Sequence, residues 1–231
     1  MVVLPRRDAP ELLDNPGSIP ADLTANLRDI RFINRWFGGA TIAERLVLRA
    51  VSGAKRASVL DVGTGSGDIP RALLRRSKTG GLDLRVTALD LSAEILDEAR
   101  RHIGDLPVRL ELGDARRLPF PDASFDVVLC SLVLHHFGAA DAITVLSEMW
   151  RVANRAVVVG DLRRCRAGYV AAWLVTRTVA SNRVTRHDGP LSVLRAYTPD
   201  EVRSLAASAR LEHCRVEQCW PFRLTLYAVK G

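Results

Sequence analysis

A glycine-rich segment carries the strongest chemical signal in the sequence. Residues 61–68 read Asp-Val-Gly-Thr-Gly-Ser-Gly-Asp and follow a short apolar run. Glycines let a backbone turn sharply and approach a ligand closely. A phosphate loop would continue with Gly-Lys-Ser/Thr, but Gly67 is followed by Asp68, and the glycine spacing also departs from the dinucleotide fingerprint. A carboxylate at Asp68 would repel a pyrophosphate, so the segment favours a neutral or cationic ligand.

Two further acids follow later apolar runs and suit a nucleoside. Asp90 ends the run 84–89, where a carboxylate can accept hydrogen bonds from both ribose hydroxyls. The residues Gly113-Asp114-Ala115 follow the run 108–112, where the acid can accept from an adenine amino group and the alanine leaves room for the ring. The predicted cofactor-binding residues are Asp61, Gly63, Thr64, Gly65, Gly67, Asp68, Asp90, Leu91, Gly113, Asp114, Ala115 and Ser131.

A histidine pair, His135 and His136, follows a fourth apolar run at 125–131. Histidine can remove a proton from a phenol or enol near neutral pH. Both histidines are therefore candidate general bases. In the alternative interpretation, one ring packs against the loop around the cofactor and the other faces solvent.

Elements that position these residues follow from the alternation of apolar runs with amphipathic segments. We expect strands at 58–62, 84–89, 108–112, 125–131 and 156–162, with helices at 68–76, 93–103 and 139–151 between them. Such alternation predicts a parallel sheet with right-handed crossovers. The runs 211–219 and 222–229, joined by Trp220-Pro221, predict a hairpin with an antiparallel last strand. The predicted class is a doubly wound, Rossmann-like α/β fold.

Segments outside the alternation are expected to cover the site. Four prolines make residues 1–20 an extended, mobile lead-in, and helices are predicted at 21–35 and, with Thr41 as its cap, up to residue 52. A lid insertion at 163–197 would hold a helix at 166–184 and a polar loop at 185–197, before a helix that starts at Thr198-Pro199. The candidate cover residues are Arg31, Asn34, Arg35, Trp36, Phe37, Tyr169, Trp173, His187, Asp188, Arg195 and Tyr197.

Two of these cover features have alternative interpretations. Tyr169 and Trp173 are four apart and so share a helix face, a spacing more typical of a core than of a pocket. The residues His187-Asp188-Gly189 could supply a second base or form a plain turn.

Length and composition fit one globular domain over residues 1–231, since 48% of the residues are apolar. The net charge of +7 comes from arginines scattered along the chain, which favours a solvated surface over nucleic-acid binding. The four cysteines show no C-x-x-C pair or zinc spacing, and Asp161, His187 and Asp188 have no defined ligand spacing, so no metal site is predicted. No secretory signal or membrane-spanning run is evident, which predicts a cytoplasmic protein.

Together, residues 59–67, 88–92 and 113–120 with the run 125–128 resemble the class I methyltransferases that use S-adenosylmethionine (SAM). They are particularly similar to the group that includes the ubiquinone and menaquinone biosynthesis enzymes. The resemblance covers about residues 22–162. It implies a seven-stranded sheet with the last strand antiparallel, and SAM as the cofactor. It also implies that Asp61 and its glycines face the amino-acid end of SAM, Asp90 the ribose and Asp114-Ala115 the adenine, and that residues 130–137 line the methyl-transfer cleft.

The leading hypothesis is methyl transfer to oxygen or carbon of a small molecule, such as a phenolic, quinol or polyketide-like ring of secondary metabolism. The basic charge leaves an RNA or protein methyltransferase as an alternative. However, the sequence carries neither the Asn/Asp-Pro-Pro-aromatic signature of amino-methylating DNA enzymes nor a Pro-Cys nucleophile pair. A protein that binds SAM without catalysis is a third possibility.

Overall fold

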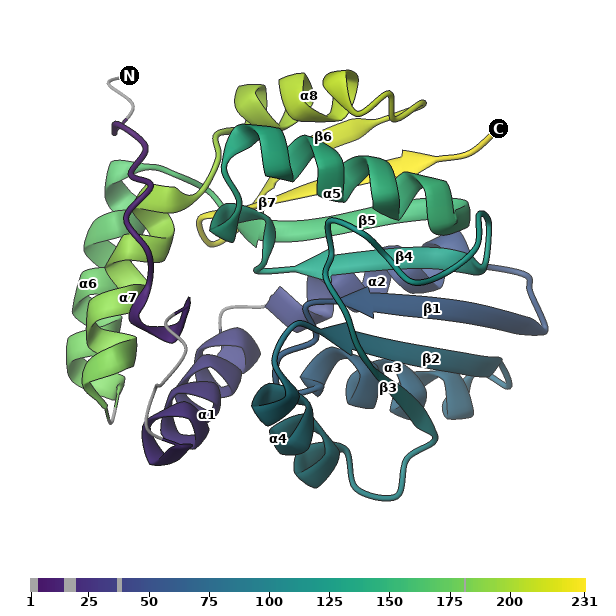
Figure 1. Ribbon diagram of the computed structural model, residues 1–231, viewed down its shortest axis with the longest axis horizontal. Helices are drawn as coiled ribbons and strands as arrows, with labels where there is room; N and C mark the ends of the chain where they lie inside the picture. Colours follow the sequence, from purple (N-terminus) through teal and green to yellow (C-terminus); the bar gives the residue numbers. More distant parts are fainter. Residues whose placement is uncertain (1–3, 15–19, 37–38, 181) are drawn as a thin grey trace.

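A single twisted sheet forms the centre of the molecule (Figure 1). The computed structural model describes residues 4–14, 20–36, 39–180 and 182–231. The strand order in this part of the chain is β3-β2-β1-β4-β5-β7-β6, in which β7 is antiparallel to both of its neighbours and the other pairs are parallel. The strands are β1 Arg56–Val62, β2 Asp83–Asp90, β3 Val108–Leu112, β4 Phe125–Ser131, β5 Ala153–Leu162, β6 Arg215–Cys219 and β7 Arg223–Val229. This topology confirms the predicted doubly wound fold and its C-terminal hairpin.

Helices cover both faces of the sheet, because successive strand residues point to opposite sides. In β1, Val59 belongs to the buried cluster that includes residues of α2 and α3, whereas Leu60 belongs to the cluster on the other face, which includes residues of α5 and α8. The α-helices are α1 Pro20–Trp36, α2 Gly39–Ala50, α3 Asp68–Thr79, α4 Ala93–Ile103, α5 Ala139–Val152, α6 Arg166–Val179, α7 Arg183–Arg195 and α8 Pro199–Ser208. Short 3-10 turns lie at η1 Leu12–Asp14 and η2 Leu134–His136. Thr41 lies inside α2 rather than at its cap.

A third group of elements lies beyond the carboxyl ends of the parallel strands. Figure 1 shows α1, α6, α7 and the N-terminal segment gathered at that edge of the sheet. The predicted polar loop at 185–197 is wrong, because residues 183–195 form α7. The Asn182 side chain accepts the Thr185 N–H at 2.9 Å and caps this helix, and packing against α6 outweighs the presence of Pro190 inside it.

The N-terminal segment 4–14 is hydrogen-bonded to α7, whereas the sequence predicted a mobile lead-in over residues 1–20. The Asp188 carboxylate accepts the N–H groups of Leu12 and Leu13 at 2.9 and 3.1 Å. Glu11 is buried, with 3% of its surface exposed. Because donors and acceptors are matched across the contact, the segment forms part of the cover over the strand ends.

All four cysteines lie in the described part of the chain as free thiols. Among the described residues, no helix is both long and apolar enough to cross a bilayer.

Candidate active site

A cavity of about 770 Å³ opens at the carboxyl ends of β1, β2 and β4. One part of its lining comes from loops of the sheet and the other from α1, α6, α7 and residues 8–13. Predicted site residues in this lining are Asp61, Gly63, Thr64, Gly65, Asp68, Asp90, Leu91, Gly113, Asp114, Ala115, Ser131, His135 and His136. The fold therefore brings the separate sequence motifs to one place, as open α/β sheets do at their ligand sites.

The glycine loop presents backbone to the cavity at Gly65. This residue has φ +55°, and a Cβ added there would meet no heavy atom within 4 Å. Gly67 differs, since it is absent from the cavity lining and a Cβ there would lie 2.5 Å from Ile103 Cδ1. The absence of a side chain at Gly67 therefore lets α3 pack closely against α4, and its predicted contact with the cofactor stays a prediction.

Buried acids surround the loop. Asp61 accepts a hydrogen bond from the Thr64 hydroxyl at 2.7 Å, and burial raises its pKa to about 7. Asp90 accepts the N–H groups of Gly65 and Ser92 at 3.0 and 3.3 Å, and burial raises its pKa as well. Burial also raises the pKa of Asp68. Carboxylates whose ionisation is opposed in this way are stabilised by a cationic ligand.

At the end of β3, the Asp114 carboxylate already has a partner within the protein, whereas the sequence predicted it as an acceptor for the adenine amino group. Its carboxylate accepts from the Arg116 guanidinium at 2.7 Å, and this hydrogen bond holds the pKa of Asp114 below its usual range. Ala115 is buried, whereas Leu91 lies along the cavity with 68% of its surface exposed. This part of the cavity wall therefore combines an apolar surface with a carboxylate.

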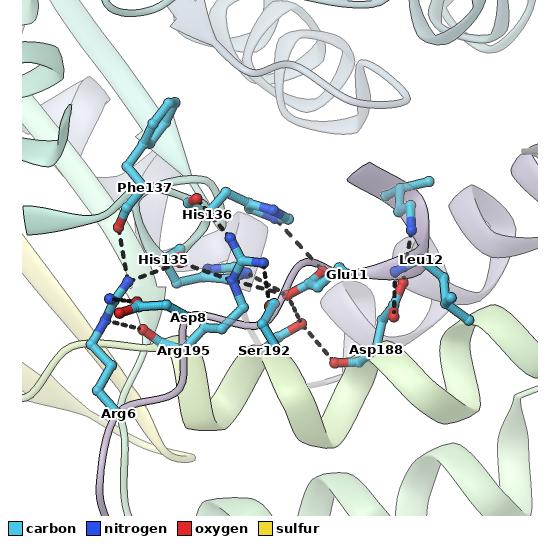
Figure 2. Close-up of polar contacts among 12 residues, drawn as sticks. Arg6, Asp8, Glu11, Leu12, His135, His136, Phe137, Asp188, Ser192 and Arg195 are labelled. Atoms are coloured by element: carbon cyan, nitrogen blue, oxygen red, sulfur yellow. Dashed lines mark hydrogen bonds and ion pairs between the residues drawn. The ribbon is translucent and has the colours of Figure 1, made fainter. Parts of the chain in front are cut away.

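The two histidines lie in η2, directly after β4 (Figure 2). The buried His135 ring places Nδ1 2.7 Å from Asp161 Oδ1, and its backbone N–H donates to Asp161 Oδ2 at 3.0 Å. Burial raises the pKa of Asp161, but the His135 ring and the backbone N–H groups of Leu162 and His135 together lower it, so the net pKa lies below its usual value. The His136 ring lies beside His135, with 4.4 Å between ring centroids and 33° between planes.

Glu11 completes this group, although nothing in the sequence pattern singles it out. Its Oε1 lies 3.7 Å from His135 Nε2, and its Oε2 lies 3.9 Å from His136 Nε2. It accepts the Ser192 hydroxyl at 2.8 Å. Figure 2 shows the carboxylate between the histidines and α7. Glu11 is far from His135 in the sequence, so only the folded chain brings them together.

The predicted cover residues divide into two groups. Asp188 and Arg195 line the cavity, and the Arg195 guanidinium donates to the carbonyls of Ala9 and His136 at 2.8 and 2.6 Å. Tyr197 is buried and donates its hydroxyl to the Phe137 carbonyl at 2.7 Å, so it holds the loop after η2 in place.

The other predicted cover residues lie away from the cavity. Tyr169, Trp173 and His187 are absent from the lining, and the Arg177 guanidinium lies over the Trp173 ring at 4.1 Å. Trp173 is 41% exposed, so the interpretation as core is also wrong for it. His187 is exposed and bonds its neighbour Asp188, which does not support a second base at this position. Arg31 is likewise outside the lining, and the side chains of residues 34–37 lie outside the described set.

Comparisons with known proteins agree with the geometry. A family model described as a methyltransferase domain matches residues 59–156. An uncharacterised methyltransferase of Mycobacterium bovis is 32% identical over 156 residues, which cover 63% of this chain and 74% of that protein. The chain belongs to the class I SAM-dependent methyltransferases. The resemblance inferred from the sequence motifs is thereby confirmed, and the cofactor of this methyltransferase is SAM.

Two further comparisons involve a relative that matches over a shorter stretch and a solved structure that shares the fold. A demethylmenaquinone methyltransferase of Deinococcus radiodurans is 44% identical over 96 residues, covering 41% of this chain and 37% of that protein. The matched part thus spans less than half the length of that relative. A SAM-dependent methyltransferase structure from Aquifex aeolicus superposes with a TM-score of 0.64 at 20% identity, covering 91% of this chain and 98% of that one, which shows the shared fold.

The residues of the cavity fit SAM. Gly65 leaves open space where a side chain would stand, and the buried acids Asp61 and Asp90 lie beside it. SAM carries an ammonium and a sulfonium, and such charges relieve the unfavourable ionisation of these acids.

Proposed function

We propose that this methyltransferase transfers the methyl group of SAM to oxygen or carbon of a small apolar acceptor, such as a phenol, a quinol or a polyketide-like ring. SAM supplies an electrophilic methyl group. The observation that carries the proposal is that the cavity continues from the glycine loop into a chamber with an apolar lining. The apolar side chains in that part include Leu13, Ile30, Ile33, Ala171, Ala172 and Val175.

In this proposal, the strand ends hold the cofactor. Asp61 binds the amino-acid end, Asp90 the ribose hydroxyls, and Asp114 with Ala115 the adenine. Leu91, Gly113 and Ser131 complete the lining. The apolar chamber then orients the acceptor against the methyl group, and positioning of this kind supplies much of the rate in a displacement at carbon.

His135 is suited to remove the acceptor proton. The hydrogen bond between its Nδ1 and the Asp161 carboxylate favours the tautomer in which Nδ1 carries the proton. The lone pair of Nε2 is then on the opposite side of the ring from Asp161, near Glu11, and His135 lines the cavity. His136 lines the same cavity and is the second candidate base.

Two observations support a small acceptor over RNA. The chamber is lined by apolar side chains, and the acids Asp8, Asp68 and Asp141 lie in the lining. Carboxylates at these positions repel phosphates. The name of the relative from Deinococcus radiodurans, a demethylmenaquinone methyltransferase, also suggests a quinone-like ring.

The first test is binding of SAM and S-adenosylhomocysteine by calorimetry, followed by turnover on a panel of phenols and quinols. We expect His135→Asn to lower kcat by about 100-fold or more while SAM still binds, because a general base contributes that much. The exposed His213→Asn is the control. Binding without turnover on any acceptor would favour the non-catalytic alternative, and full activity of both His135→Asn and His136→Asn would exclude a histidine base.

A further inference from the structure

We propose that Glu11, His135 and His136 bind one divalent metal ion of intermediate hardness, such as Zn²⁺, Co²⁺ or Fe²⁺. Each residue offers one ligand atom, and these atoms all lie within 4.8 Å of one another. Two imidazoles and one carboxylate form a ligand set that such ions prefer. The binding itself does not depend on the proposed function. When the ion is bound, the Nε2 atoms of His135 and His136 are its ligands, so the ion takes the place of a histidine base in activating the acceptor, and this catalytic role rests on the proposed methyl transfer.

The spacing of the three ligand atoms suits an ion between them. The Glu11 oxygens lie 3.7 and 3.9 Å from Nε2 of His135 and His136, which is longer than a direct hydrogen bond. Ligands bound to Zn²⁺ at about 2.0–2.2 Å in tetrahedral geometry lie roughly 3.3–3.5 Å apart. The three ligand atoms, which lie within 4.8 Å of one another, would therefore have to draw together around the ion. The two rings lie side by side, with 4.4 Å between their centroids, and both Nε2 atoms lie within 3.9 Å of a Glu11 carboxylate oxygen.

Neighbouring residues already orient two of the three ligands. Asp161 bonds His135 Nδ1 at 2.7 Å, and Ser192 donates to Glu11 at 2.8 Å. A carboxylate on the far nitrogen of a histidine and a hydrogen bond to the ligand carboxylate are the usual outer contacts of a protein metal site. Both hydrogen bonds are present before the ion binds, so forming them adds no entropy cost to metal binding.

Buried carboxylates and guanidinium groups set the charge around the proposed metal site. Glu11 and Asp161 are both buried beside the histidines. The Arg195 guanidinium lies 4.0 Å from Glu11, but it donates to the carbonyls of Ala9 and His136 and so is held by the backbone. An ion bound by Glu11 would thus add its charge to two buried carboxylates, of which Glu11 lies beside Arg195 and Asp161 is attracted to the buried Arg223.

Three protein ligands leave a coordination position open toward the cavity, as in catalytic metal sites. The hydroxyl of a phenol or enol acceptor could coordinate there through its oxygen. The ion would lower the pKa of that hydroxyl, the proton would pass to water, and the oxygen lone pair would attack the methyl carbon as the carbon–sulfur bond breaks. The acceptor class is therefore a ring that carries an acidic hydroxyl.

The experiment is a Co²⁺ titration of the full-length protein after treatment with a chelator. Binding is followed by the visible absorption of Co²⁺ and by calorimetry. We expect one Co²⁺ per chain, and we expect Glu11→Gln to lower its affinity at least about tenfold. The matched controls are Glu212→Gln and His213→Ala, which alter an exposed carboxylate and an exposed imidazole. SAM binding by each variant shows that the cavity is folded.

Co²⁺ affinity that is equal in Glu11→Gln and the parent protein would overturn the proposal, as would a failure to bind Co²⁺ by protein that binds SAM. Loss of Co²⁺ binding in His213→Ala would assign the ion to the surface and would also overturn it. The readout is separate from methyl transfer. Co²⁺ binding that depends on Glu11 supports the site even if no phenol or quinol is methylated, and turnover without Co²⁺ binding would leave the proposed function intact.

Discussion

At the scale of single residues, the cavity concentrates acids around one glycine loop. Burial raises the pKa of Asp61, Asp68 and Asp90, and Asp61 reaches about 7. Each of these groups is more easily protonated in the folded protein than in water because its ionised form is desolvated. A cation that enters the cavity reverses this effect, so cofactor binding and protonation are coupled.

Proton release should accompany SAM binding at mildly acidic pH. At about pH 6, Asp61 is mostly protonated in the ligand-free protein, since its pKa is about 7. The SAM ammonium would lower that pKa and expel the proton, whereas at about pH 9 the carboxylate is already ionised and no release is expected. Calorimetry in buffers of different ionisation enthalpy measures the release. Asp61→Asn should reduce the proton release at about pH 6. Net proton uptake at that pH would contradict the contact between Asp61 and the SAM ammonium.

Asp90→Asn should weaken SAM binding by roughly 10- to 100-fold. The substitution keeps the shape of the side chain but removes a charged acceptor, and hydrogen bonds to charged groups contribute about 1.5–3 kcal/mol. Asp83→Asn is the matched control because Asp83 is an exposed acid at the opposite end of β2. Equal SAM affinity of Asp90→Asn and Asp83→Asn would show that Asp90 does not hold the ribose.

At the scale of elements, the cover over the cavity is built from parts that do not belong to the sheet. The helices α6 and α7 pack against each other, and the N-terminal segment lies along α7. The two helices approach closely at Gly189 and the buried Thr176, both of which line the cavity. The shape of the acceptor chamber therefore depends on how closely these two helices approach.

Gly189→Ala should destabilise the protein, although alanine normally favours a helix. A Cβ at this position would clash with the Thr176 Cγ2 methyl, and Thr176 is buried and β-branched, so it cannot easily move. Overpacking costs about 1–3 kcal/mol, which exceeds the helix gain of up to about 1 kcal/mol. Urea denaturation measures the free energy of unfolding.

Thr176→Ser in the same chain removes the clashing methyl and keeps the hydroxyl that donates to the Ala172 carbonyl. The double variant should therefore recover most of the stability lost in Gly189→Ala. Stabilisation by Gly189→Ala alone would argue against the close packing of α6 on α7.

Arg195→Lys should loosen the N-terminal segment while leaving the glycine loop intact. Arg195 is buried and joins Ala9 to the carbonyls of His135 and His136. Lysine cannot reproduce this fork of donors, so we expect a loss of about 2–3 kcal/mol. The Tm should fall by roughly 5–10 °C, with a larger loss in kcat/KM than in SAM affinity. Arg203→Lys, on the exposed side of α8, should change neither.

At the scale of the whole molecule, the net charge of +7 and the charge of the cavity have opposite signs. The acids of the lining are Asp8, Glu11, Asp61, Asp68, Asp90, Asp114, Asp141 and Asp188, whereas its arginines are Arg116, Arg195 and Arg223. The basic surplus therefore lies mainly outside the cavity, and it carries no information about the acceptor.

Methyl transfer to a phenol or quinol should consequently depend little on salt. We expect kcat/KM to change by less than about twofold between 50 and 200 mM KCl, because a neutral acceptor releases few counterions on binding. An RNA substrate held by several phosphate contacts would lose roughly 1,000-fold in affinity over the same range. A steep fall of kcat/KM with salt would therefore favour the alternative of a nucleic-acid substrate.

The sequence by itself determined the sheet and the cofactor end of the cavity. Residues 61–68, Asp90 and Asp114 follow strands, and the carboxyl ends of parallel strands meet at one edge whatever else surrounds them. Periodicity and turn residues are local signals, so even the C-terminal hairpin was predictable. The packing role of Gly67 was not predictable, because its tight contact with Ile103 depends on how α3 packs against α4.

Only the tertiary structure decided the acceptor end. The predicted loop 185–197 is α7 because a cap at Asn182 and packing against α6 outweigh a proline inside the helix. Glu11 meets His135 only because Asp188 and Arg195 bind the backbone of residues 9–13. These contacts join residues that are far apart in the sequence. Spacing along the chain cannot reveal them, because they form when separate elements pack together over the strand ends.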